Sequence, residues 1–478
     1  MKRIQSIRIW GVITMLLLYC IPLQGSAGSA KGKGKEKEKA PVRISLDEGM
    51  AWQPLLDANG GMKTAKGSIY HKLGLDIEFV VIPDPVTAAS SVIKGEAVGA
   101  GYTINRYALL QERFDRNNVQ VRMPLLMGYS DGEEGIIANA DIQSAKDLIG
   151  KRIAVVEFSE TQSFVEWLLK NAELTEQEWE DTRQTMLYTK TTEEAGEALF
   201  AGQADAAAAW GPYLTQARKA ADVAVLFDTS MSTSLMLSGI VFRQEFLDEN
   251  QDFVVKFIEG ALEEAPTYGQ KASGVKPATW AQNKELLQLN GIAADIYKDM
   301  AEIWKALGKA AYPEKAQNAF TDEFILMLAE KYETQEAGEE RRFTEGNRRR
   351  TLEAGEANAL MRYTLDIEFE PNAVNIAAIS YEELDAIIRV ASILDGMFIQ
   401  IEGNASTRAA GITDEQIKGF SLSRADAIAA YFIQKGIQAD RIITIGNGDS
   451  KPVADDSTEE GKAQNRRTEI YIKPVVAE

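Results

Sequence analysis

The sequence contains very few of the residues that most often carry out catalysis or bind metals. It has one cysteine, Cys20, and one histidine, His71, among 478 residues. Cleavage of a leader beyond Cys20 would leave no thiol, which excludes a disulfide, a thiolate metal site and a cysteine nucleophile. His71 lies between predicted elements, and no metal-binding cluster is evident. We therefore expect no catalytic residue, no metal and no cofactor.

Positive charge is also scarce. Lys and Arg number 52 against 71 Asp and Glu, for a formal net charge of −19. Removing residues 1–30 takes away three positive charges and no negative ones, which changes that charge to −22. Such an acidic protein repels phosphate backbones, so nucleic acid is not an expected partner.

Residues 1–30 have the order of a secretory signal peptide: positive charges, the apolar run Ile9–Ile21, then small residues. The run is shorter than the roughly 20 apolar residues of a membrane-spanning helix. We expect export to the periplasm. Lipidation at Cys20 is the alternative, but the bulky Tyr19 before it fits a lipoprotein signal poorly. Residues 31–41 are rich in Lys, Gly and Glu, which predicts a solvated flexible leader.

From residue 42 onward, short apolar stretches alternate with longer amphipathic ones, which predicts βαβ units and mostly parallel sheets. The predicted strands are Val42–Leu46, Leu75–Ile82, Arg152–Glu157 and Thr185–Tyr188, and the predicted helices are Val86–Lys94, Thr161–Asn171 and Glu193–Ala201. After Phe242 the pattern is almost wholly helical to about Lys331.

Three stretches of this region resemble the substrate-binding proteins of ABC importers for nitrate, sulfonates, taurine and thiamine precursors. They are residues 71–110, 128–174 and 201–217, the last reading AGQADAAAAWGPYLTQA. The resemblance implies an α/β clamshell over residues 42–331, with a second lobe at about 133–230. It also implies a small-molecule solute and an ABC permease as partners.

Such a clamshell holds its ligand between strand ends and helix N-termini, where free backbone N–H groups and the helix dipole are available. Ser159 and Thr161 follow a predicted strand and open a helix, although an ordinary helix cap is the alternative. An aromatic side chain in this region provides either a flat wall for the ligand or plain core packing. The candidate ligand-binding residues are Trp52, Tyr102, Thr103, Ser130, Asp131, Ser159, Thr161 and Trp210. Tyr102 and Thr103 are predicted to lie in a turn after Gly99–Gly101.

The charge of these motifs bears on the ligand. No Arg or Lys is assigned to the cleft, whereas Asp131, Glu157 and Glu160 stand in its motifs. If these carboxylates point inward, the site disfavours phosphate, sulfate or nitrate and favours a zwitterion, an amine or a neutral heterocycle.

Residues 332–358 are dense in Glu, Arg, Gly and Gln, which predicts a partly helical linker; a basic patch is the alternative. A second α/β unit follows over residues 359–478. Its predicted strands are Tyr363–Phe369, Phe398–Gly403, Ile442–Ile445 and Glu469–Lys473, and its helices are Tyr381–Leu394 and Phe420–Lys435. The segments LDIEFEPNAVNI, IQIEGNAS and residues 420–472 resemble the OmpA C-terminal domain, which implies a βαβαββ fold that binds peptidoglycan.

In that family the motif arginine, here Arg424, holds a carboxylate of diaminopimelate, a task suited to a planar guanidinium. The family's partner aspartate is replaced by Ser406, and Asp414 is a possible substitute. Losing a charge-assisted bond of about 1.5–3 kcal/mol would weaken binding roughly 10- to 150-fold. Asn465 completes the candidate peptidoglycan site, and Arg467 is expected to be structural.

The sequence thus predicts a non-catalytic periplasmic solute-binding protein, associated with the cell wall or outer membrane through its C-terminal domain. Two alternatives stay open. One is an enzyme related to thiamine-precursor synthases, which share the clamshell but need His, Cys or an activated Lys. The other is a structural envelope protein whose clamshell binds no ligand.

Overall fold

The computed structural model describes residues 40–270, 274–334, 343–367, 376–406 and 411–476. The predicted signal peptide and nearly all of the charged leader lie outside these residues. The described chain from residue 41 onward is one compact unit built on three sheets. Among the described residues, no helix combines the length and apolarity that a membrane crossing requires.

The first lobe is built on a six-stranded sheet of order β11-β4-β10-β3-β1-β2. Its strands are β1 (Val42–Leu46), β2 (Ile77–Val81), β3 (Gly99–Thr103), β4 (Val121–Ser130), β10 (Leu237–Arg243) and β11 (Val275–Pro277). Its helices are α1 (Gln53–Asn59), α2 (Ile69–Lys72), α3 (Pro85–Ile93), α4 (Ile104–Arg116), α9 (Gln244–Glu249), α10 (Gln251–Gly269), α11 (Trp280–Leu286), α12 (Ile292–Ala306), α13 (Ala316–Ala319), α14 (Glu323–Leu326) and α15 (Ala329–Tyr332).

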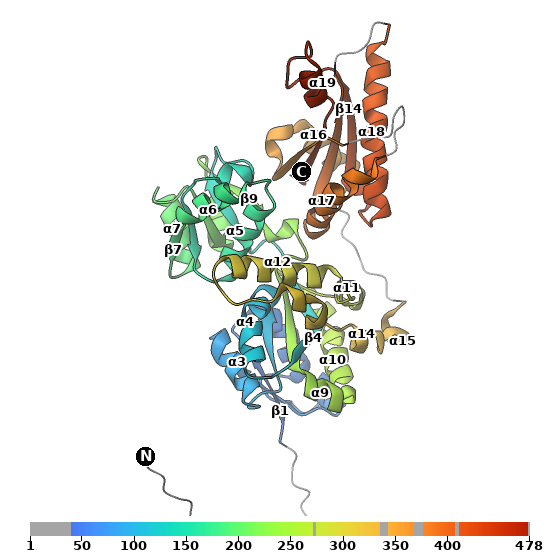
Figure 1. Ribbon diagram of the computed structural model, residues 1–478. Helices are drawn as coiled ribbons and strands as arrows, with labels where there is room; N and C mark the ends of the chain where they lie inside the picture. Colours follow the sequence, from blue (N-terminus) through green and yellow to red (C-terminus); the bar gives the residue numbers. More distant parts are fainter. Residues whose placement is uncertain (1–39, 271–273, 335–342, 368–375, 407–410, 477–478) are drawn as a thin grey trace, which may run out of the picture. The chain divides into compact units, whose positions relative to one another are not determined.

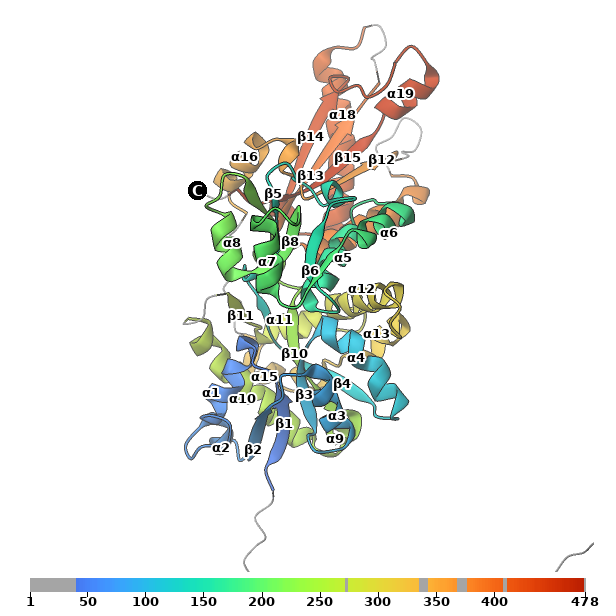
Figure 2. The same cartoon turned by 90° about the vertical axis from the view of Figure 1, so that its left-hand side faces the viewer.

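The second lobe is inserted between β4 and β10 and has a five-stranded sheet of order β7-β6-β8-β5-β9. Its strands are β5 (Glu134–Asn139), β6 (Ile153–Val156), β7 (Leu187–Thr189), β8 (Ala206–Trp210) and β9 (Val223–Asp228). Its helices are α5 (Glu160–Lys170), α6 (Glu176–Gln184), α7 (Thr192–Phe200) and α8 (Gly211–Ala217). Helices α5 and α6 lie on one side of the sheet and α7 and α8 on the other (Figure 2). Because β8 is covered on both faces, it is an alanine run with no exposed surface from Ala206 to Ala209.

The expectation of mostly parallel sheets is wrong. In the first lobe β1 pairs in parallel with β2 and β3, but β10 runs antiparallel to both β3 and β4. In the second lobe β5 runs antiparallel to β8 and β9. The reason is topological: the chain leaves the first sheet after β4 and returns through β10. Two short segments, residues 131–133 and 229–236, therefore join the lobes, and we call them the hinge segments.

The third sheet has the order β12-β15-β13-β14 and forms the C-terminal domain. Its strands are β12 (Met361–Leu365), β13 (Met397–Asn404), β14 (Ile442–Gly448) and β15 (Thr468–Pro474), and its helices are α16 (Glu345–Glu353), α17 (Tyr381–Ile393), α18 (Asp414–Gln434) and α19 (Glu459–Asn465). The long helix α18 runs beside this sheet (Figure 1). A Cβ atom at Gly403 would lie 2.1 Å from the carbonyl oxygen of Ser421, so glycine permits this close packing.

The elements of the C-terminal domain confirm the predicted fold class, with two differences. Helix α18 begins at Asp414 and not at Phe420, because Thr413 and Gln416 form a capping box at its start. The short helix α19 is added between β14 and β15. In the first lobe, the predicted helical stretch after Phe242 is interrupted by β11 (Val275–Pro277).

Glu166 on α5 is a carboxylate with no exposed surface in the core of the second lobe. Its Oε2 atom accepts a hydrogen bond of 2.7 Å from Nε1 of Trp179. Burial raises the pKa of the Glu166 carboxyl from 4.5 to about 7. The folded protein therefore holds the proton of the Glu166 carboxyl more tightly than the unfolded chain does. As the pH rises from the pKa of the unfolded chain to that of the folded protein, this residue lowers the free energy of unfolding.

We predict that Glu166→Gln stabilises the protein at pH 8 but not at pH 4. The glutamine still accepts from Trp179 and never becomes charged. The gain should grow between pH 4.5 and 7 and then stay constant, reaching at most about 3 kcal/mol. The midpoint of thermal unfolding, measured across this range, checks it. A gain equal at all pH values would contradict the assigned pKa.

Candidate functional site

The candidate residues of the first lobe lie in the short 3-10 helix Met50–Trp52, which follows β1, and at the end of β3. Trp52 is 2 % exposed, and its ring lies over Gly101, where a Cβ atom would come within 2.8 Å of it. Its Nε1 atom donates to Oδ1 of Asp47 at 2.5 Å. Tyr102 is buried, and burial raises the pKa of its hydroxyl. The structure therefore gives Trp52 and Tyr102 largely a packing role.

Thr103 holds the start of α4 and reaches the other lobe. Its Oγ1 atom accepts from the backbone N–H of Arg106 and donates to Oε1 of Glu160 at 3.3 Å. Tyr102 and Thr103 are the last residues of β3 and do not lie in a turn, which corrects the prediction from sequence. Residues with strand geometry immediately before a helix N-terminus suit the edge of a ligand site.

Ser130 and Asp131 lie where the chain enters the second lobe. The Ser130 hydroxyl donates to Oε2 of Glu134 and lies 2.8 Å from the hydroxyl of Thr229 on the second hinge segment. Asp131 forms a 2.8 Å ion pair with Lys276 of β11. Burial raises the pKa of the Glu134 carboxyl.

In the second lobe, Ser159 caps α5 as predicted and accepts from the backbone N–H of Gln162. Thr161 is buried, and its hydroxyl lies 2.8 Å from that of Ser159. Trp210 ends β8 with 39 % of its surface exposed and is the cross-strand neighbour of Glu134. Among the predicted aromatic residues, Trp210 is therefore the one whose ring is available to a ligand.

Polar contacts close the boundary between the two lobes where α4 meets α5. Arg106 on α4 forms a bidentate ion pair with Glu160 on α5, with distances of 2.8 Å from Nε to Oε1 and 2.6 Å from Nη2 to Oε2. Each side chain is 25 % exposed. Next to them, Nδ2 of Asn105 donates to Oγ of Ser163 at 2.7 Å.

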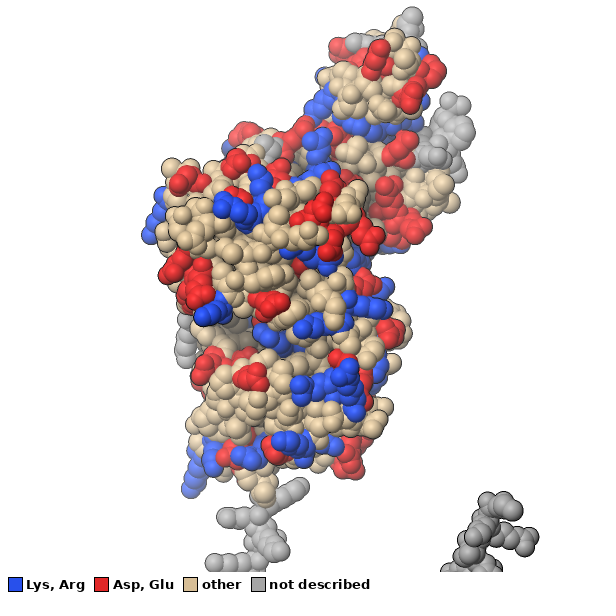
Figure 3. Space-filling model, turned by 60° about the vertical axis from the view of Figure 1, so that its left-hand side comes forward, with Lys and Arg blue, Asp and Glu red and all other residues tan. Residues whose placement is uncertain are grey.

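The sequence analysis assigned no Arg or Lys to the cleft, whereas the structure places basic side chains at the boundary between the lobes. Besides Arg106, Lys276 pairs with Asp131, and Nζ of Lys309 lies 3.5 Å from the ring centroid of Phe158. Arg106 falls within the quoted motif of residues 71–110, but its partner is 54 residues away and was not apparent from the sequence. Glu157 lies two residues before the cap Ser159, and Glu160 is neutralised by Arg106. Acidic and basic side chains are likewise interspersed over the face shown in Figure 3.

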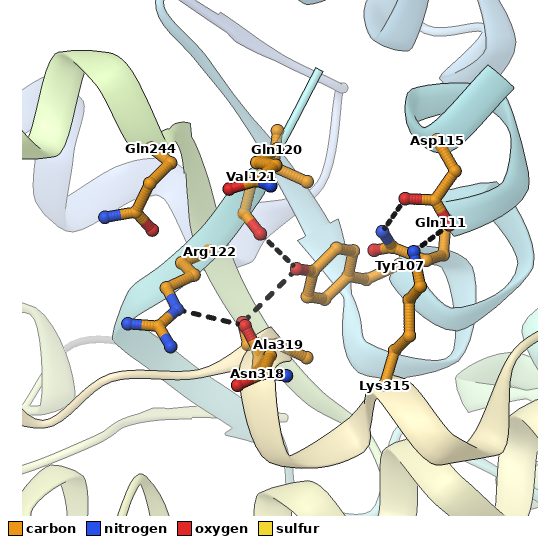
Figure 4. A pocket seen from close by; sticks show the side chains of 10 residues that line it. All are labelled: Tyr107, Gln111, Asp115, Gln120, Val121, Arg122, Gln244, Lys315, Asn318 and Ala319. Atoms are coloured by element: carbon orange, nitrogen blue, oxygen red, sulfur yellow. Dashed lines mark hydrogen bonds and ion pairs between the residues drawn. The ribbon is translucent and has the colours of Figure 1, made fainter. Parts of the chain in front are cut away.

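A separate cavity of about 380 Å³ lies in the first lobe, lined by residues of α4, β4 and α13 and their flanking segments (Figure 4). Arg122 donates from Nε to the carbonyl oxygen of Asn318, and Lys315 pairs with Asp115 at 2.6 Å. The hydroxyl of Tyr107 is hydrogen-bonded to the carbonyl oxygens of Val121 and Ala319. None of the predicted ligand-binding residues lines this cavity.

In the C-terminal domain, Arg424 is half-buried on α18 with its guanidinium 4.5 Å from the ring centroid of Phe420. Burial and the nearby Arg466 lower its pKa. A second positive charge beside Arg424 favours an anionic ligand such as a carboxylate. Ser406 lies two residues beyond the end of β13, and Asp414 is the first residue of α18.

The structure assigns two other motif residues to holding the fold. Asn465 has no exposed surface; it accepts from the backbone N–H groups of Val453 and Ala454 and donates to the carbonyl oxygen of Ala454. In the structure its amide is thus occupied by this loop. Arg467 pairs with the buried Glu469 at 2.9 Å, in agreement with the structural role expected for it.

No group of three or more His, Cys, Asp and Glu side chains is placed to hold a metal ion within the described ranges. His71 lies exposed on α2, within the first lobe.

The comparisons with known proteins divide the chain in the same way. The family described as NMT1/THI5 like matches residues 65–268, and the OmpA family matches residues 368–466. One region of the chain is therefore similar to the NMT1/THI5-like family and another to the OmpA family, which confirms both resemblances seen in the sequence.

Individual relatives match parts of the chain. Outer membrane protein A of Bordetella avium is 39 % identical over 89 residues, which are 19 % of this chain and 44 % of that protein. Peptidoglycan-binding protein ArfA of Mycobacterium bovis is 42 % identical over 52 residues, 11 % of this chain and 16 % of that protein. The chain thus spans less than half the length of either relative. A crystal structure of the periplasmic aliphatic sulphonate binding protein SsuA from Escherichia coli aligns with a TM-score of 0.44 and 14 % identity, covering 60 % of this chain and 99 % of that one.

We predict that Arg106 and Glu160 are energetically coupled. In a double-mutant cycle of Arg106→Gln and Glu160→Gln, the free energies of unfolding should show a coupling of about 1–2 kcal/mol, because the pair is bidentate and partly buried. The exposed pair Lys256 and Asp252 serves as a control and should give at most about 0.5 kcal/mol. Additive effects at Arg106 and Glu160 would show that the ion pair contributes nothing.

Proposed function

We propose that this protein is an exported envelope protein that captures a small solute between its two lobes and binds peptidoglycan through its C-terminal domain. The observation that carries the proposal is the joining, on one chain, of an NMT1/THI5-like two-lobed unit with two hinge segments to an OmpA-family domain. A clamshell of this kind binds by closing, and its natural partner is an ABC permease that receives the solute.

A binding function is favoured over catalysis by the position of the reactive side chains. The one histidine lies on α2, whereas the polar contacts between the lobes involve the N-terminal ends of α4 and α5. Those contacts come from Arg, Glu, Asn, Ser and Thr, which are suited to hydrogen bonding and ion pairing. Of the residues predicted from sequence, Thr103, Ser130, Asp131, Ser159 and Trp210 are the ones we assign to the solute site, together with Arg106, Glu134 and Glu160.

The charges at the boundary refine the class of solute. Glu160 and Asp131 are each neutralised by a basic side chain, so the site is not the purely acidic one expected from the sequence. Glu134 pairs with a hydroxyl, and the pKa of its carboxyl is raised by burial. A site with both guanidinium and carboxyl groups suits a zwitterion or a neutral polar heterocycle.

We expect the full chain, purified without denaturation, to carry a solute that native mass spectrometry detects by mass. Trp210→Ala should lower solute retention about tenfold or more, since an aromatic wall contributes about 1.5–3 kcal/mol of contact. Leu187→Ala, a similarly exposed apolar change in the second lobe, is the control. The contrary result is that native mass spectrometry finds no solute and no tested metabolite raises the unfolding temperature. That result would favour the alternative of a structural envelope protein whose clamshell binds no ligand.

For peptidoglycan, we expect the chain to sediment with purified sacculi. Arg424→Ala should lower the affinity at least about tenfold, because a charge-assisted bidentate bond is lost. Arg349→Ala, an exposed arginine on α16, should leave it unchanged.

A second variant should gain affinity in the same sedimentation assay. Restoring the family's carboxylate with Ser406→Asp should raise the affinity for sacculi about tenfold or more. Ser457→Asp adds the same charge elsewhere in the domain and serves as the control. Unchanged sedimentation in both Arg424→Ala and Ser406→Asp would rule out this mode of binding.

A further inference from the structure

The C-terminal domain contacts one of the two hinge segments of the clamshell directly. The turn between α17 and β13 lies against residues 231–233. Oγ of Ser232 donates to the carbonyl oxygen of Ile393 at 2.6 Å, and the backbone N–H of Gly396 donates to the carbonyl oxygen of Met231 at 3.1 Å. These bonds engage the backbone of the turn, so they depend on its position and not on one side chain.

Asp395 and Gly396 show how closely the two segments fit. The backbone N–H of Thr233 donates to Oδ1 of Asp395 at 2.7 Å. A Cβ atom at Gly396 would lie 2.7 Å from the carbonyl oxygen of Ser230, closer than such contacts allow. Glycine at this position therefore permits the domain to dock on the hinge.

Other contacts join the domain to the second lobe. The backbone N–H of Ala145 donates to the carbonyl oxygen of Leu360 at 3.0 Å, and the hydroxyl of Tyr363 donates to the carbonyl oxygen of Asn171 at 2.9 Å. The domain is thus held by the second lobe and the hinge, and we expect it to move with that lobe.

One further contact reaches the first lobe. Asp299 lies on α12, a helix bonded to α4 through a 3.0 Å hydrogen bond from Nε1 of Trp304 to the carbonyl oxygen of Asn105. Asp299 is 2 % exposed and accepts from three basic or indole groups. Two come from the second lobe, Trp167 at 2.9 Å and Lys170 at 3.3 Å, and the third is Arg389 of α17 at 2.6 Å.

The carboxylate of Asp299, on the first lobe, thus accepts hydrogen bonds from both the second lobe and the C-terminal domain. The bonds from Trp167 and Lys170 to Asp299 form only while α12 and the second lobe are in contact. The bond from Arg389 forms only while α12 contacts α17 of the C-terminal domain, which we expect to move with the second lobe. Separation of the lobes breaks all three and leaves a charged group to be rehydrated. A domain that moves with the second lobe and supplies one of these bonds therefore favours the closed arrangement.

We propose that the C-terminal domain is a clamp on the clamshell, which shifts the equilibrium between open and closed lobes toward the closed form. The inference rests on the proposed function in that closure is the step by which solute is captured. Because coupling between two equilibria is reciprocal, a solute that closes the lobes also strengthens docking of the domain.

The test is the distribution of distances between the lobes in solution. The one native cysteine is replaced by Cys20→Ser, and spin labels are placed at Glu96→Cys in the first lobe and Gln216→Cys in the second, both exposed. Pulsed electron paramagnetic resonance then measures the label-to-label distance in the full chain. Gly396→Ala and Arg389→Gln should each raise the ratio of open to closed molecules about tenfold or more. Arg389→Gln does so because it removes a charge-assisted hydrogen bond, and Gly396→Ala because the added Cβ atom clashes with the hinge segment.

Gly419→Ala is the matched control, because a Cβ atom at this position on α18 meets no atom within 4 Å. It should leave the distances as they are in the unsubstituted chain. Circular dichroism and thermal unfolding show whether each variant is folded, and Arg389→Gln tests the clamp without a steric change. The proposal is overturned if both variants fold and keep the distance distribution of the control.

This measurement requires neither solute nor peptidoglycan. A shift in distance with no detectable solute or sacculus binding would retain the clamp and reject the proposed function. Solute capture and sacculus binding with unchanged distances would reject the clamp and retain the function.

Discussion

The return of the chain to its first sheet is the constraint on which the structure depends. Strand β10 enters between β3 and β4, antiparallel to both, after the whole second lobe has been built. A lobe inserted in this way has two covalent connections to the first lobe, so any movement between the lobes would turn about the two hinge segments.

The boundary between α4 and α5 is held by polar groups. A bidentate ion pair and an amide-to-hydroxyl bond join the helix ends, and a lysine lies over an aromatic ring. Water can replace such contacts when the lobes separate, at a much lower cost than the exposure of a comparable apolar surface. The chemistry of the boundary is therefore compatible with repeated opening and closing.

The C-terminal domain combines a buried network of ion pairs with contacts to the rest of the chain. Two buried glutamates of its sheet form these ion pairs. Glu402 pairs with Lys451, and Glu469 pairs with Arg467 and Arg362. Arg424 lies outside this network, on the helix that covers the opposite face. The turn before β13 contacts the second hinge segment, so the position of this domain and that of the hinge segment depend on each other.

The sequence by itself determined the features that depend on neighbouring residues. Strand β1 begins and ends at the predicted residues, α17 differs by one residue, and Ser159 caps α5 as expected, because apolar periodicity and capping act within a few positions. The regions similar to the NMT1/THI5-like and OmpA families were likewise recognisable from motifs.

Tertiary structure decided what depends on residues far apart in the chain. The pairing of Arg106 with Glu160, the antiparallel insertion of β10 and the use of Asn465 by a loop all bring together segments that no local pattern relates. The same holds for the contact of Arg389 with Asp299, 90 residues apart. Local sequence sets which elements form, whereas burial and charge pairing between distant elements set which side chains remain available for function.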